Sequence, residues 1–201
     1  MWEIIQDAGW PIWPLIFTSV VGFSIIIERL FSLRSSDIIP EDLMPNLELQ
    51  LKKGVIKKEE LNKMESESLL GLMLAAVIKN QGKPLEVMND AIIKAGDSIS
   101  YQLEKYLHIL AMISTVAPLL GLFGTIIGMV ELFSSFTSDG HDVEMFARGI
   151  SVALYNTAGG IVVAIPAMIS HRFFRAKIDS QIHIMETNAE RLIDLINNGR
   201  K

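Results

Sequence analysis

The sequence predicts an all-α integral membrane protein with three transmembrane helices. Two stretches, Ile109–Val130 and Gly149–Ser170, each run for 22 residues without a charged side chain. A helix of that length is roughly 33 Å long, which matches the thickness of a bilayer's hydrocarbon core. A third apolar run, Pro11–Ile27, lies near the N-terminus. The mean hydropathy of +0.35, with 20% charged residues, fits membrane helices combined with a sizeable part that faces water.

The N-terminal run, residues 11–27, is expected to be a retained span. Trp10 and Trp13 lie at its entrance, and indole rings favour the headgroup region of a bilayer. A signal peptide is the competing interpretation, but it needs a basic region before the apolar run. Here that region carries Glu3 and Asp7 and no Lys or Arg, which favours a span.

Basic residues predict the orientation of the spans. They gather after the first span, before the second and after the third. On the opposite side, Arg148 is the one basic residue near a span, and several acidic residues accompany it. The positive-inside rule then places the N-terminus outside and the C-terminus in the cytoplasm. The expected segments are an N-terminus outside the membrane (1–10), a first span (11–27), a cytoplasmic helical region (28–106), a second span (107–131), an outside loop (132–148), a third span (149–170) and a cytoplasmic C-terminal helix (171–201).

The second and third membrane helices are expected to extend into the cytoplasm. Within Pro84–Leu107, apolar residues recur at steps of three and four, and this helical pattern continues into the second span without a breaker. The C-terminal tail has an apolar stripe that needs a partner helix. It packs either against the extension before Leu107 or against a neighbouring copy, and both contacts are compatible. The stripe consists of Ile178, Ile182, Met185, Ala189, Leu192 and Ile196.

Several function classes find no support in the sequence. The chain has no Cys and its four His residues are scattered, so no metal-ligand spacing is evident. It contains no phosphate-binding loop and no nucleophile motif, so we expect neither an enzyme nor a bound cofactor. The net charge of −5 is mild and gives no reason to propose nucleic-acid binding.

The central hairpin carries two faces of small residues. Small side chains let membrane helices approach closely, so these faces are expected to pack helices together. The packing residues are Gly121, Gly124 and Gly128 on the second span and Gly149, Ala153 and Gly160 on the third.

Three polar residues, Thr125, Asn156 and Thr157, lie on the same two faces. A lone membrane Thr usually bonds a carbonyl of its own helix and has no further role. Asn156 cannot be satisfied so locally and should face protein or water. Together the three residues are candidates for the lining of a polar pathway.

These residues form two motifs that resemble the ExbB/TolQ/MotA proton-channel family. The motifs are A-P-L-L-G-L-F-G-T-I-I-G-M at Ala117–Met129 and G-I-S-V-A-L-Y-N-T-A-G-G-I-V-V-A-I-P-A at Gly149–Ala167. They cover about 50 residues, and the topology extends the match to the whole chain. The small size, outside N-terminus and long segment after the first span favour the ExbB branch. A TolQ-like role in envelope integrity stays open, and a MotA-like role is disfavoured because those chains usually have four spans.

The resemblance implies a homopentamer in a bacterial inner membrane, with residues 1–10 and 132–148 in the periplasm. Its central pore would enclose helices of an ExbD-like, single-span partner. An Asp of that partner would take and release protons, and the complex would pass energy to a TonB-like protein that opens outer-membrane transporters for iron chelates and vitamin B12. The family's pore threonines correspond to Thr125 and Thr157. The hairpin contains no acid of its own, as such a division of labour requires, and membrane lipids would surround the ring.

One position departs from the family pattern. Many members have a glutamate where this chain has Val152, so a relay through that side chain is impossible here. Either the glutamate is dispensable, or Glu131 near the outer mouth takes its place, or transport differs in detail. Glu131 could equally be a solvated charge at a helix end. Two hypotheses of another class are a self-sufficient channel, which the absence of an intramembrane charge disfavours, and a passive membrane scaffold.

Overall fold

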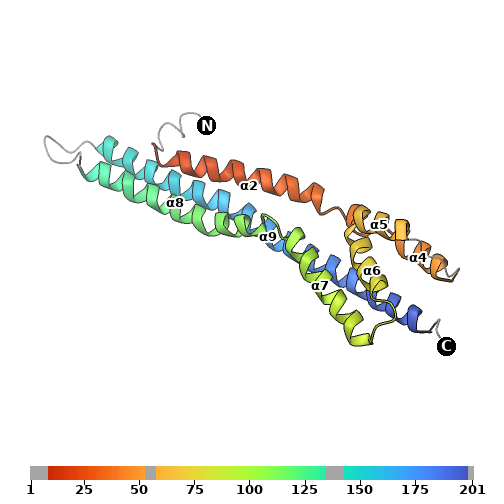
Figure 1. Ribbon diagram of the computed structural model, residues 1–201. Coiled ribbons are helices and arrows are strands. Elements are labelled where there is room, and N and C mark those ends of the chain that lie inside the picture. Colours follow the sequence, from red (N-terminus) through yellow and green to blue (C-terminus); the bar gives the residue numbers. More distant parts are fainter. Residues whose placement is uncertain (1–8, 53–57, 135–142, 199–201) are drawn as a thin grey trace. The chain divides into compact units, whose positions relative to one another are not determined.

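The structure, a computed structural model, describes residues 9–52, 58–134 and 143–198 (Figure 1). Every regular element in these ranges is a helix. Three helices are long and apolar enough to cross a membrane, namely α2 (Ile12–Ser32), α8 (Leu107–Ser134) and α9 (Val143–Asn198). The predicted all-α class with three membrane-compatible helices is confirmed.

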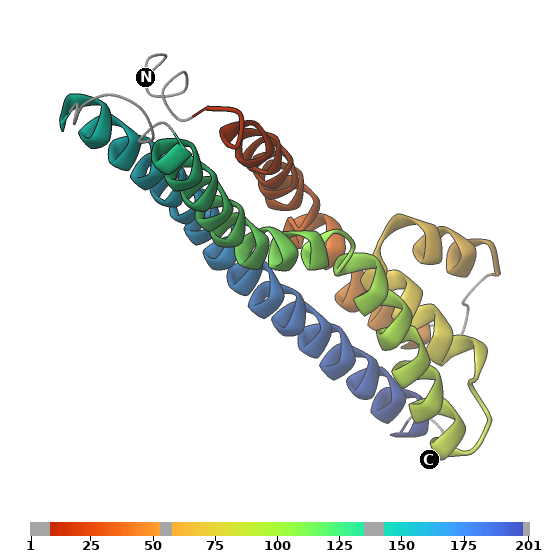
Figure 2. The same cartoon turned by 90° about the vertical axis from the view of Figure 1, so that its left-hand side faces the viewer.

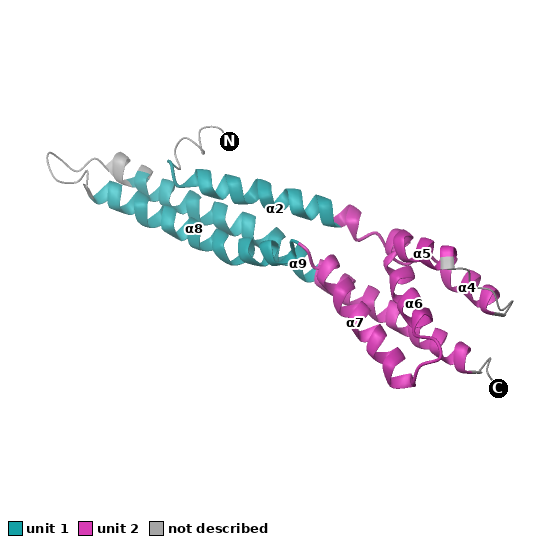
Figure 3. Cartoon of the chain, in the orientation of Figure 1, with its two compact units in different colours: residues 1–29, 106–173 teal, residues 30–105, 174–201 magenta. Residues whose placement is uncertain are grey.

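The chain divides into two compact units (Figure 3). Unit 1 comprises Met1–Arg29 and Tyr106–Phe173, and unit 2 comprises Leu30–Lys105 and Phe174–Lys201. The three apolar runs of the sequence therefore gather in unit 1, and most of the charged residues gather in unit 2.

In unit 1, α2, α8 and the first part of α9 lie side by side (Figures 1 and 2). The α2 helix meets the other two through a buried cluster of Leu15, Ala117 and Ala164. A Cβ placed on Gly22 of α2 would lie 3.5 Å from Cδ1 of Ile113 on α8, which is ordinary packing distance. Many large apolar side chains of these helices stay exposed in the single chain, as expected for surfaces that meet lipid or other subunits.

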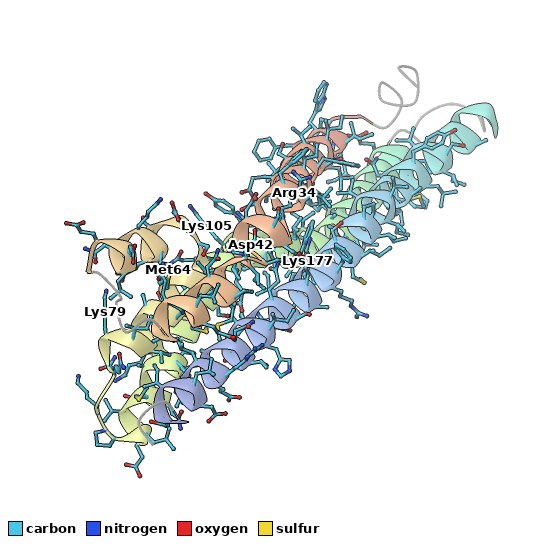
Figure 4. All side chains as sticks on the ribbon, turned by 90° about the vertical axis from the view of Figure 1, so that its right-hand side faces the viewer. Arg34, Asp42, Met64, Lys79, Lys105 and Lys177 are labelled. Carbon is cyan, nitrogen blue, oxygen red and sulfur yellow. The ribbon has the colours of Figure 1, made fainter. Side chains whose placement is uncertain are left out.

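Unit 2 is a helical assembly around the C-terminal part of α9. Its other helices are α3 (Ser35–Ile38), α4 (Leu43–Lys52), α5 (Lys58–Glu67), α6 (Leu69–Lys79) and α7 (Leu85–Leu103). Figure 4 draws the side chains, with Met64 of α5 and Lys79 of α6 labelled. The α9 stripe is covered within the chain: five of its six members are buried, namely Ile178, Met185, Ala189, Leu192 and Ile196.

Polar contacts also hold α9 within unit 2. The buried Gln181 donates from Nε2 to the carbonyl oxygen of Leu33 and to the hydroxyl of Ser35, each at 3.3 Å. Leu33 directly follows α2, so Gln181 satisfies a carbonyl that the end of that helix leaves without an intrahelical donor. Arg191 pairs with Glu48 at 2.7 Å at the other end of the unit.

The expectation that one helix runs unbroken from Pro84 into the second span is wrong. The α7 helix ends at Leu103, α8 begins at Leu107, and Tyr106 between them has φ 68°. That left-handed conformation costs a residue with a Cβ roughly 1–2 kcal/mol. The guanidinium of Arg29, 5.6 Å from the centre of the Tyr106 ring, offsets part of this cost by a cation–π interaction.

Candidate functional site

The two apolar helices of the hairpin touch backbone to backbone. A Cβ placed on Gly160 would lie 2.6 Å from the carbonyl oxygen of Ala117, and one on Gly121 would lie 2.7 Å from that of Asn156. Real Cβ atoms do not approach backbone so closely, so both positions need glycine for this contact. Close approach gives the dispersion contacts on which membrane helices depend for association.

The contact continues along α8 and α9 in one antiparallel register. A Cβ on Gly128 would lie 3.6 Å from Cβ of Ala153, and one on Gly149 would fall 2.0 Å from Cδ1 of Leu132. The packing residues proposed from the sequence are thus brought together. Leu132 was missed because a leucine in an apolar helix carries no sequence signal that distinguishes it from its neighbours.

Thr125 and Thr157 face each other at the middle of this contact. Their hydroxyl oxygens share a short hydrogen bond that links α8 to α9. The Thr125 hydroxyl also lies 2.9 Å from the carbonyl oxygen of Ala153 and 3.1 Å from that of Gly121. Both side chains are half-buried in the single chain. The pair is therefore a polar point where α8 and α9 meet, in a hairpin whose two apolar stretches carry no charged side chain.

Counting protons shows that the two hydroxyls have different roles. Each Thr has one O–H donor and two acceptor lone pairs. Either hydroxyl could donate to the other, but Thr125 has two backbone carbonyls within donor distance, so we assign its proton to one of those carbonyls. Thr157 then donates to the Thr125 oxygen, and its own lone pairs remain available. Thr157 can therefore accept from a carboxylic acid or turn its proton toward a carboxylate.

Asn156 lies beside the pair, enclosed between the two helices. None of its surface is exposed, and its Nδ2 donates to the carbonyl oxygen of Val152 at 3.3 Å. A Cβ on Gly124 would lie 2.7 Å from both Cβ and Cγ of Asn156. The Asn156 side chain thus occupies the space that the missing side chain of Gly124 leaves.

The other sequence candidates lie away from the pair. Glu131 is exposed near the C-terminal end of α8, and Val152 is half-buried on α9. Arg29 was not singled out as a site residue, yet its side chain is only 5% exposed and pairs with Glu28. The sequence does not show that Arg29 is buried, because this depends on its contact with Tyr106, which is remote in the sequence.

The charge content of the hairpin limits its chemistry. Neither Ile109–Val130 nor Gly149–Ser170 contains an acidic or basic residue. Within the described ranges, no group of three or more His, Cys, Asp or Glu could hold a metal ion. The pair can offer hydroxyls to a titrating group, and neither stretch supplies a carboxylate of its own.

Comparison with known proteins gives a consistent result. The family model described as the MotA/TolQ/ExbB proton channel family matches residues 57–187. Biopolymer transport protein exbB1 of Vibrio cholerae is 26% identical over 171 residues, which are 83% of this chain and 75% of that protein. Biopolymer transport protein ExbB of Helicobacter pylori is 37% identical over 95 residues, 45% of this chain and 66% of that protein. Tol-Pal system protein TolQ of Haemophilus influenzae is 33% identical over 79 residues, 39% of this chain and 35% of that protein.

Proposed function

Because this chain belongs to the MotA/TolQ/ExbB proton channel family, we propose that it is the pore-forming subunit of a motor that the proton-motive force drives. The family is one of transport subunits rather than enzymes, and the apolar helices make the chain a multi-pass inner-membrane protein. In the proposal, the motor energises TonB-dependent import of iron chelates and vitamin B12. The N-terminus of the chain is periplasmic and its C-terminus is cytoplasmic.

The observation that carries the proposal is the hydroxyl pair Thr125–Thr157 in a hairpin without charge. Moving one charge across a membrane potential yields about 2.3 kcal/mol per 100 mV. To use that energy, a carboxylate must meet the two aqueous sides in turn, and ionisation is strongly disfavoured in bare lipid. The pair gives such a carboxylate hydroxyl groups with which it can form hydrogen bonds inside the membrane.

The partner in this proposal is an ExbD-like single-span protein with a membrane Asp. When that Asp is protonated, its O–H donates to the Thr157 oxygen. When it is ionised, Thr157 turns its own proton toward the carboxylate, and Thr125 keeps its bond to a backbone carbonyl. A homopentamer would present five such pairs around the partner helices. Glu131, exposed nearer the end of α8, is proposed to lie at the outer mouth.

Replacing both threonines with valine tests the role of the pair. Valine keeps the shape and removes the hydroxyls, so we expect the Thr125→Val/Thr157→Val chain to assemble with its partner and to lose proton-driven uptake. Thr115→Val is the matched control, because the Thr115 hydroxyl is exposed and bonds to carbonyls of its own helix, Ala111 and Met112. Normal uptake by the double variant would refute the proposal and favour a passive scaffold. Proton conductance by the purified chain alone in liposomes would favour a self-sufficient channel.

A TolQ-like role in envelope integrity is the second candidate, supported by the similarity to the Haemophilus protein. Both roles use the same pair, so the variants cannot separate them. Deleting the gene does separate them: loss of vitamin B12 uptake with an intact envelope supports the first role. Detergent sensitivity with normal uptake supports the second.

A further inference from the structure

We infer that Asn156 is a positioning residue: its side chain, seated over Gly124, fixes the register of α8 against α9 and so holds Thr157 beside Thr125. The inference rests on the proposed function of the pair. It assigns Asn156 a role at the helix contact, in place of the pore-lining role expected from the sequence.

The burial of Asn156 supports this role. A side chain that lines a pathway within one subunit keeps some surface free, whereas Asn156 has none. Polar residues are rarely enclosed in a helix contact without a reason, because desolvating an amide is costly. In coiled helices, a single buried Asn is known to specify register at some expense in stability.

The shape of the contact explains how the register is fixed. Small residues face small residues along most of it, as at Gly121 and Gly160, and such a surface alone would allow the helices to slide. Asn156 is a large side chain opposite a glycine, and sliding would drive it into a neighbouring residue. Thr125 and Thr157 directly follow Gly124 and Asn156 in the sequence, so the position of the Asn156 side chain also sets the position of the hydroxyl pair.

A disulfide can report the register, because the chain has no cysteine of its own. A Cβ on Gly128 would lie 3.6 Å from Cβ of Ala153, within the range for a disulfide. The Gly128→Cys/Ala153→Cys chain, co-expressed with its single-span partner in membranes, is oxidised for increasing times. Free thiols are then counted by a mass-adding maleimide after denaturation. Uptake is measured in parallel in the chain without the engineered cysteines.

Three variants at the contact decide the matter. Gly124→Ala places a Cβ 2.7 Å from Asn156, so we expect cross-linking to slow at least about tenfold and uptake to fall with it. Gly124→Ala/Asn156→Gly removes both obstructing carbons, Cβ and Cγ of residue 156, and should restore both to within about threefold of the parent. Asn156→Leu, which keeps a side chain branched at Cγ, should preserve both.

Other results would overturn the inference. Unchanged cross-linking in Gly124→Ala would show that the two residues do not set the register. Restored cross-linking without restored uptake in the double variant, together with inactive Asn156→Leu, would show that the amide itself acts in the pathway. Neither result tests the proposed role of the threonine pair. That role would be refuted by normal uptake in Thr125→Val/Thr157→Val while the disulfide still forms.

Discussion

Thr125 of α8 is bound to Ala153 of α9 by a hydroxyl–carbonyl hydrogen bond of 2.9 Å. A bond to this carbonyl or to that of Gly121 occupies the single proton of Thr125, so Thr157 is the member of the pair whose proton is able to change direction. The two threonines look equivalent in the sequence, yet their surroundings are different. Thr125 supports the arrangement, and Thr157 is the group that a partner's carboxyl would meet.

This difference predicts unequal effects of the single substitutions. Thr157→Val should lower proton-driven uptake more, because a hydrogen bond to a charged group contributes about 1.5–3 kcal/mol. Thr125→Val should lower it less, because a neutral hydrogen bond contributes about 0.5–1.5 kcal/mol. Thr157→Ser should retain most of the activity. The measurement is the initial rate of vitamin B12 uptake at matched protein levels.

The same experiment contains its own check. Thr115→Val changes a hydroxyl that bonds within α8 and faces outward, so uptake should stay at the parental level. Equal losses in Thr125→Val and Thr157→Val would contradict the difference that the hydrogen bonds indicate.

Substituting alanine for each of two neighbouring glycines of α9 should affect stability differently. Gly160→Ala places a Cβ 2.6 Å from the Ala117 carbonyl oxygen, whereas Gly159→Ala places one 3.9 Å from a side-chain carbon of Leu15. Overpacking a rigid backbone contact typically costs about 1–3 kcal/mol. We therefore expect Gly160→Ala to lose stability, measured as the SDS fraction that unfolds the purified complex in mixed micelles, and Gly159→Ala to match the parent. Similar midpoints for the two variants would show that the helices are not in backbone contact.

The sequence was sufficient for the apolar helices because their signal is local. A run such as Ile109–Val130 has to be helical in lipid, where no water satisfies the backbone. The spacing of Gly121 and Gly160 also indicated which faces pack. Residues of these faces do meet in the structure, because close backbone approach needs small side chains on both helices.

The sequence was not sufficient where one residue depends on another far along the chain. The break after α7 lies at Tyr106, a residue type that gives no turn signal, and its partner Arg29 is remote in sequence. The different roles of Thr125 and Thr157 likewise depend on the Ala153 carbonyl of the other helix. Periodicity reveals which face a residue occupies, but not the neighbour that it meets there.

Removing the amide of Gln181 is expected to lower the stability of unit 2. Gln181→Leu keeps much of the volume but leaves the Leu33 carbonyl without this donor. A buried polar group that loses its partner costs about 1–3 kcal/mol. We expect a lower thermal-unfolding midpoint for the purified complex. Gln102→Leu, at an exposed position of α7, is the matched control and should leave the midpoint unchanged.

The turn at Tyr106 predicts an order of stability among three chains. Tyr106→Ala loses the ring that meets Arg29 and keeps a Cβ in the left-handed conformation, so it should be the least stable. Tyr106→Gly loses the same ring but removes the backbone penalty of roughly 1–2 kcal/mol, so it should lie between alanine and the parent. Arg29→Met completes a double-mutant cycle with Tyr106→Ala, and the coupling should be about 0.5–2 kcal/mol for a cation–π pair in which Arg29 is buried and Tyr106 is partly exposed. Denaturant midpoints of the purified complex are measured for five chains: the parent, the three single variants and the Arg29→Met/Tyr106→Ala double variant. If alanine were as stable as glycine at this position, the turn would not hold residue 106 in the left-handed conformation, and the separation of α7 from α8 would need another cause.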